Sequence, residues 1–118
     1  MQLLLADIKV ENHLSDKGDV IAALANWLVA EGCVSADYGA SMLAREAMAS
    51  TYLGQGVAIP HGTRASASLV QRSAIKVMLL PKGVRWEHSE KAYLVIAIAA
   101  DSKQHLPILA QLTTLLNQ

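Results

Sequence analysis

The stretch Tyr93-Leu-Val-Ile-Ala-Ile-Ala99 decides the fold class, because it is apolar throughout and rich in valine and isoleucine. A strand with one solvated face alternates apolar and polar residues, whereas a strand covered on both faces is continuously apolar. We therefore expect residues 93–99 to form the central strand of a sheet. A helical leucine pattern follows it, and Pro107 is placed in the first turn of this helix, where proline removes no hydrogen bond.

The rest of the chain shows helical spacing first and strands later. Val20, Leu24, Trp27 and Leu28 recur every three or four residues, as in an amphipathic helix that Gly32 stops. By the same reasoning the other elements are a helix over 35–49, with Ser35 as N-cap, strands over 57–59 and 73–80, a turn over 81–83 and a short edge strand over 84–86. This order predicts one layered α/β domain over residues 1–118, with a mixed sheet flanked by helices.

Composition excludes several classes of function. The chain of 118 residues is long enough to close one core, and 53% of it is hydrophobic. Ten basic residues balance ten acidic ones without runs of like charge, which excludes the electrostatic pattern of a nucleic-acid binder. The longest apolar run, Ala92 to Ala100, is too short to cross a bilayer, and the N-terminal residues lack the pattern of a secretion signal. Together with the single Cys33, these features predict a cytoplasmic protein without direct membrane insertion.

The segment Gly54-Gln-Gly-Val-Ala-Ile-Pro-His-Gly-Thr63 carries the candidate chemistry. A short apolar strand ends in a proline that fixes the backbone just before His61, and Gly62 leaves room beside the ring. A neutral imidazole is a nucleophile at cellular pH, because its unperturbed pKa is about 6.5. Phosphoryl transfer needs mainly a positioned nucleophile, a hydrogen-bond donor and a cation. Taken alone, however, His61 is equally compatible with a turn histidine that only hydrogen-bonds a carbonyl.

Two further residues could complete such a site. His105 is expected at the start of the last helix, where a helix N-terminus favours negative charge, although a helix-capping role is the alternative. Arg45 lies late on the second predicted helix, and its guanidinium could bind two phosphate oxygens, although a single arginine on a helix is most often only solvated.

The combination of motifs resembles the fructose/mannitol IIA family of the bacterial sugar phosphotransferase system (PTS). The matching segments stand in the family's order: Ala44-Arg-Glu46, Thr51-Tyr-Leu-Gly54, Gly56-Val-Ala-Ile-Pro-His-Gly-Thr63, Leu79-Leu-Pro-Lys-Gly-Val84 and Ala99-Ala-Asp-Ser-Lys-Gln-His-Leu106. The resemblance covers nearly the whole chain. Members of the family usually extend some tens of residues beyond the last leucine-rich helix, so the resemblance also implies a C-terminal extension that this sequence lacks.

The resemblance implies a phosphotransferase component that needs no cofactor. On the family pattern His61 accepts a phosphoryl group from the phosphohistidine of the carrier protein HPr and passes it to a cysteine of a IIB domain during uptake of a fructose- or mannitol-like sugar. His105 matches the second active-site histidine, which orients the phosphorylated ring, and Arg45 matches an active-site arginine. The alternative is a regulatory module, in which phosphorylation of His61 controls binding to a transporter, a kinase or a transcription factor.

The remaining candidate residues enter no mechanism at this stage. Thr51 and Thr63 could supply hydroxyl donors beside the motif, and Arg64 is expected to be solvated. His13 and His88 are expected in exposed polar segments, and the histidine spacing does not match a zinc site, so no metal is expected.

Overall fold

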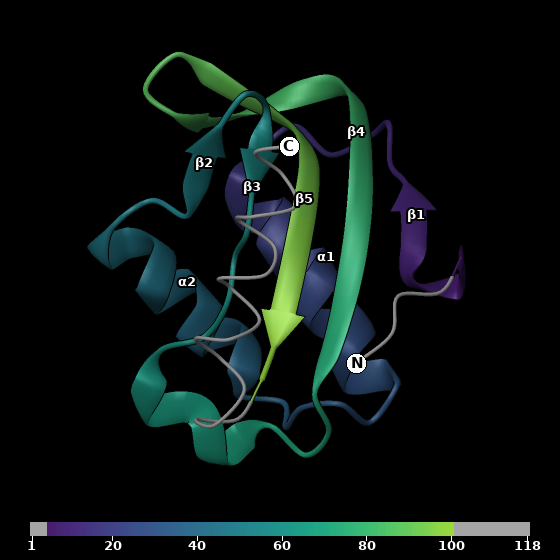
Figure 1. Cartoon of the computed structure of the whole chain (residues 1–118), viewed down its shortest axis with the longest axis vertical. Coiled ribbons are helices and arrows are strands. Elements are labelled where there is room, and N and C mark those ends of the chain that lie inside the picture. Colours follow the sequence, from purple (N-terminus) through teal and green to yellow (C-terminus); the bar gives the residue numbers. More distant parts are fainter. Residues whose placement is uncertain (1–4, 101–118) are drawn as a thin grey trace.

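The protein is described here by a computed structural model, which places residues 5–100 (Figure 1). The predicted helix that contains His105 lies outside the described residues. The observed elements are the 3₁₀ helix η1 (Leu5–Asp7), β1 (Ile8–Val10), α1 (Lys17–Ala30), α2 (Tyr38–Met48), β2 (Tyr52–Gly54), β3 (Val57–Ala58), the 3₁₀ helix η2 (Arg64–Leu69), β4 (Ala74–Glu87) and β5 (Glu90–Ala99).

The described strands form one mixed sheet of five strands in the order β1-β4-β5-β3-β2. β5 is the middle strand, as its continuous apolar sequence predicts; it pairs antiparallel with β4 and parallel with β3. Every residue from Val95 to Ala100 is buried. In Figure 1, β1 and β2 form the two edges of the sheet, and α1 passes behind β4 and β5. The predicted layered α/β fold is therefore confirmed.

β4 differs from the prediction. Instead of a strand, a turn over 81–83 and a separate edge strand, Ala74–Glu87 is one continuous strand. Leu79 pairs with Leu94 and Val84 with Ala92, so β4 has three more residues than β5 between these pairs. Pro81 thus lies in a bulge, where its missing N–H interrupts no ladder, and the chain reverses later, at His88.

The two long helices cover one face of the sheet. α1 starts at Asp16, whose carboxylate accepts a hydrogen bond from the backbone N–H of Asp19, and it buries the residues that the periodicity selects. The N-cap position of α2 is Asp37 rather than the predicted Ser35, and the Asp37 side chain makes no capping hydrogen bond. The core between the helices and the sheet includes Leu24, Leu28, Met42, Leu80 and Val95.

A buried lysine joins β4 to the end of α1. Lys76, 3% exposed, forms ion pairs with Asp7 and Glu31 and lies 5.0 Å from the centre of the Trp27 ring. The hydrogen bond from Lys76, followed by one from Trp27, lowers the pKa of the Glu31 carboxyl. Within residues 5–100, no helix combines the length and apolarity that crossing a membrane requires.

Candidate functional site

The parallel pairing of β3 with β5 carries His61 to the C-terminal end of the central strand. Beyond the last residue of β3, the pairing continues because the N–H of Ile98 donates to the carbonyl of Pro60 at 3.0 Å, and His61 itself forms a bridge with Ile98. Pro60 is buried and His61 is 7% exposed. The imidazole is therefore attached to buried backbone that pairs with the central strand.

A backbone hydrogen bond selects the tautomer of the His61 ring. Nδ1 lies 2.8 Å from the carbonyl oxygen of Ile59. Because a carbonyl only accepts hydrogen bonds, Nδ1 must carry the proton. In the neutral ring the in-plane lone pair is then on Nε2, which makes Nε2 the nucleophilic nitrogen.

Tyr38 fixes the backbone on the other side of His61. Its hydroxyl accepts from the N–H of Gly62 at 3.0 Å and donates to the carbonyl of Ile98 at 3.1 Å. A Cβ at Gly62 would lie 2.7 Å from the Tyr38 ring and 2.6 Å from Oγ of Ser66. Burial raises the pKa of the Tyr38 phenol, so it remains a neutral donor. Glycine is thus required here by close packing against Tyr38 and Ser66.

Helix α2 is also bonded to the turn that follows. The hydroxyl of Ser41 accepts from the N–H of Thr63 at 2.9 Å and lies 3.2 Å from its Oγ1. Ser66 Oγ in η2 donates to the carbonyl of Thr63 at 2.7 Å. The turn after His61 is therefore held by α2, and Thr63 uses its hydroxyl to fasten this turn.

Arg45 lies one turn after Ser41 on the same helix. It is half-buried, and its Nη1 donates to the carbonyl of Ala49 at 2.6 Å, so in this structure the guanidinium caps the last turn of α2. α2 thus brings Arg45 to the side of the molecule that holds the His61 turn, but the described contacts do not join Arg45 to the ring. His105 lies outside the described residues, so its predicted position stays a prediction.

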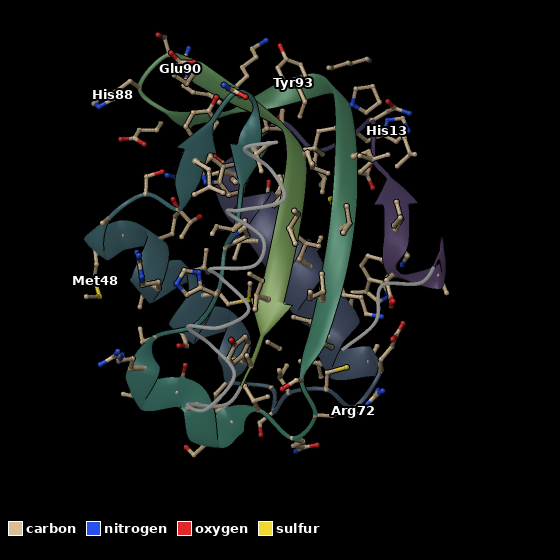
Figure 2. The ribbon with its side chains drawn as sticks, in the orientation of Figure 1. His13, Met48, Arg72, His88, Glu90 and Tyr93 are labelled. Carbon is tan, nitrogen blue, oxygen red and sulfur yellow. The ribbon has the colours of Figure 1, made fainter. Side chains whose placement is uncertain are left out.

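The structure separates the other histidines from this site. His13 and His88 are both exposed, as predicted, and Figure 2 shows them on different sides of the molecule, beside β1 and at the β4–β5 hairpin. Arg64 is exposed, as expected. Cys33 is 1% exposed, so its thiol is buried in the core.

Comparison with known proteins assigns the chain to a family. The family model described as "Phosphoenolpyruvate-dependent sugar phosphotransferase system, EIIA 2" matches residues 2–118. The chain belongs to this family. The resemblance found in the sequence motifs is therefore confirmed at the level of the family.

The relatives of this IIA domain include both larger proteins and separate domains. A multiphosphoryl transfer protein of Vibrio cholerae serotype O1 is 43% identical over 117 residues, which are 99% of this chain and 29% of that protein. The crystal structure of IIA mannitol from Escherichia coli superposes with a TM-score of 0.92 at 32% identity, covering 100% of this chain and 85% of that one. The same TM-score and identity relate the domain to enzyme IIA mannitol in a complex with phosphorylated enzyme IIB mannitol from Escherichia coli, over 99% of this chain and 83% of that one.

Sequence reasoning missed three residues of α2 that hold the backbone around His61: Tyr38 and Ser41 bond to Gly62 and Thr63, and Glu46 bonds to Thr51. The sequence analysis assigned no role to any of the three. One signal was present: Glu46 stands four residues after Met42 and eight after Tyr38, so a carboxylate is in phase with the buried side of the helix. A carboxylate on the buried side of a helix indicates that it has a polar partner in the interior.

Proposed function

We propose that this IIA domain is a phosphocarrier in which Nε2 of His61 holds the phosphoryl group. The observation that carries the proposal is the hydrogen bond from Nδ1 of His61 to the carbonyl of Ile59, because it leaves the nucleophilic lone pair on Nε2. Membership of the EIIA 2 family supports the same chemistry.

The transfer proceeds in two displacements. The Nε2 lone pair attacks phosphorus of the phosphohistidine of HPr; the bond from phosphorus to the donor nitrogen breaks, and the donor imidazole leaves. Phosphorylation gives the His61 ring a positive charge that its Nδ1–H shares with the Ile59 carbonyl. A cysteine thiolate of a IIB domain then attacks the phosphorus, and the N–P bond breaks to return neutral His61. Arg45 and His105 are proposed to bind and orient the phosphoryl oxygens and the ring.

An apolar side of α2 supports docking of such partners. Leu43 is 42% exposed and Met48 is 75% exposed; Ala40, Ala44 and Ala47 are exposed on the same face of the helix. In Figure 2 the side chain of Met48 projects from the end of α2 away from the sheet. Since α2 holds the turn after His61 through Ser41, a partner that covers this face would contact the helix that positions this turn.

The whole protein would act in the cytoplasm, in the uptake and phosphorylation of a fructose- or mannitol-like sugar. The chain spans less than a third of the length of three multiphosphoryl transfer proteins that it matches. One of its structural relatives is a IIA mannitol domain bound to phosphorylated IIB mannitol. A IIB domain is accordingly the acceptor that we propose for this chain.

Intact mass spectrometry after incubation with phosphorylated HPr tests the proposal. We expect one phosphate per chain on the parent protein and on the control His88→Ala, whose histidine is exposed, and no phosphate on His61→Ala. An unlabelled parent, or a labelled His61→Ala, would refute the carrier role of His61. Addition of a cognate IIB protein should then remove the phosphate; its retention would favour the regulatory alternative.

A further inference from the structure

Glu46 is a buried carboxylate for which the transfer chemistry has no direct use. It lies on α2 beside Arg45 and is only 6% exposed, on the side of the helix that packs against the core. A buried carboxylate is unfavourable unless hydrogen bonds or an opposite charge compensate its lost hydration. The identity of its partners therefore shows what it holds in place.

Both carboxylate oxygens of Glu46 are directed at one residue. Oε1 accepts from the hydroxyl of Thr51 at 2.6 Å, and Oε2 accepts from the N–H of Thr51 at 3.0 Å. Lys17 supplies the opposite charge, 3.3 Å from Oε2, and also donates to the carbonyl of Trp86 at 2.9 Å. Thr51 itself is 5% exposed, so water cannot easily replace these bonds.

From Thr51 the hydrogen bonds continue to the imidazole. The carbonyl of Thr51 accepts from the N–H of Ile59 at 3.0 Å, and the carbonyl of Ile59 accepts from Nδ1 of His61 at 2.8 Å. Thr51 and Ile59 directly flank the antiparallel pair Tyr52–Ala58 that joins β2 to β3. The carboxylate thus fixes the residue whose carbonyl positions Ile59, and Ile59 in turn selects the tautomer of His61.

We propose that Glu46 is a positioning residue for His61, acting through Thr51 and Ile59. This inference rests on the proposed function of His61 as phosphoryl acceptor. Glu46 acts in this role as a hydrogen-bond acceptor and exchanges no proton. Its charge polarises the hydrogen bonds that lead to the Ile59 carbonyl, and its two oxygens keep that carbonyl within reach of Nδ1 in both the resting and the phosphorylated ring.

The first test measures the tautomer of the His61 ring in the unphosphorylated protein. In ¹⁵N NMR spectra at a pH where the ring is neutral, His61 of the parent should show the Nδ1–H tautomer. Glu46→Gln has one oxygen and cannot accept both Thr51 bonds, so we expect the Nε2–H tautomer to appear. Thr51→Val, which loses only the hydroxyl, should shift the tautomers in the same direction, and Thr51→Ser, which keeps it, should restore the parent spectrum.

The matched control is Lys17→Met, which removes the other partner of Glu46 and leaves the bonds to Thr51 in place. Lys17→Met should leave the tautomer of His61 unchanged even if the substitution lowers the free energy of unfolding. A purely structural role of Glu46 predicts the opposite pattern: the variants lose stability, and the tautomer remains that of the parent in all of them. That result in Glu46→Gln and Thr51→Val would overturn the proposal.

The second test is the rate of phosphate transfer from phosphorylated HPr. Misplacement of the acceptor nitrogen should slow transfer to Glu46→Gln and Thr51→Val by about 10- to 100-fold, with near-parent rates for Lys17→Met and Thr51→Ser. If the parent is never phosphorylated while the tautomer shifts as expected, the proposed function fails and the positioning contact stands. If His61 is phosphorylated and both variants match the parent in tautomer and rate, the positioning role fails and the proposed function stands.

Discussion

Substitution of Tyr38 by phenylalanine tests how the backbone beside His61 is held. The substitution keeps the ring and removes the hydroxyl that accepts from the N–H of Gly62 and donates to the carbonyl of Ile98. Since Tyr38 is 2% exposed and Gly62 is buried, the N–H of Gly62 would be left without an acceptor. An unsatisfied buried group of this kind costs about 1–3 kcal/mol.

Urea unfolding and calorimetry measure this loss against a matched control. For a chain of 118 residues, each kcal/mol corresponds to roughly 4 °C in Tm, so Tyr38→Phe should lower Tm by roughly 4–12 °C. The hydroxyl of Tyr52 makes a similar pair of bonds, to the N–H of Gly56 at 2.9 Å and the carbonyl of Lys91 at 3.3 Å, but in a part-exposed place. Water can replace it there, so Tyr52→Phe should cost less than about 1 kcal/mol. Equal losses in the two variants would refute the reasoning.

The pH dependence of Tyr38→Phe gives a second readout. Burial raises the pKa of the Tyr38 phenol above the ordinary value of 10.0. Above that pH the unfolded chain loses the phenolic proton while the folded chain retains it, so stability falls as pH rises from 10.0 through the folded pKa. The parent should therefore lose more stability than Tyr38→Phe over this alkaline interval; parallel losses would contradict a raised pKa.

Three other substitutions test separate contacts. Gly62→Ala would place Cβ 2.7 Å from the buried Tyr38 ring, and this overpacking should cost about 1–3 kcal/mol in urea unfolding; an unchanged unfolding midpoint would disprove the close packing. Lys76→Met removes the main interaction that depresses the Glu31 carboxyl, so its pKa in an NMR titration should rise toward 4.5. A carboxyl whose pKa is lowered by folding contributes stability that is lost as the pH falls through that pKa, so this variant should also lose less stability than the parent on acidification. An unchanged Glu31 pKa would contradict the interaction of Lys76 with Glu31. Arg45→Lys should slow phosphate transfer from phosphorylated HPr, because an ammonium cannot bind two oxygens in a fork, and a parent-like rate would remove Arg45 from the site.

The long elements could be predicted because the periodicity of their apolar residues reflects which faces are buried. The helix expected around residues 20–28 and before Gly32 is observed at Lys17–Ala30, and the apolar stretch 93–99 lies in Glu90–Ala99, the middle strand. In both cases the spacing of apolar residues alone predicts which faces of the element are buried in the core. Boundaries moved by one to three residues because caps and strand ends depend on neighbouring backbone.

Apart from β3, which was expected over 57–59, the short elements could not be predicted because tertiary pairing creates them. β1 has three residues with no alternation and exists because Ile8–Val10 pairs with β4. β2 and η2 are too short for a periodic pattern. The Pro81–Gly83 segment carries turn residues, yet the strand continues through it because the bulge absorbs three extra residues.

The candidate site was predictable only where adjacent residues form it. The Pro60-His61-Gly62 sequence indicates a presented imidazole, and the structure buries His61 at the end of the central strand. Tyr38 bonds to Gly62 from a distant part of the chain, and Glu46 acts on this segment only indirectly, through Thr51. No local pattern predicts which hydroxyl or carboxylate will accept from which N–H.

The coupling between phosphorus and the ring nitrogens, measured by ¹⁵N NMR of the phosphorylated domain, tests most directly which atom bears the phosphate. Because Nδ1 of His61 donates to the Ile59 carbonyl, phosphorus should couple to Nε2 of that ring, and the proton should stay on Nδ1. Coupling to Nδ1, or phosphate on any residue other than His61, would contradict the account.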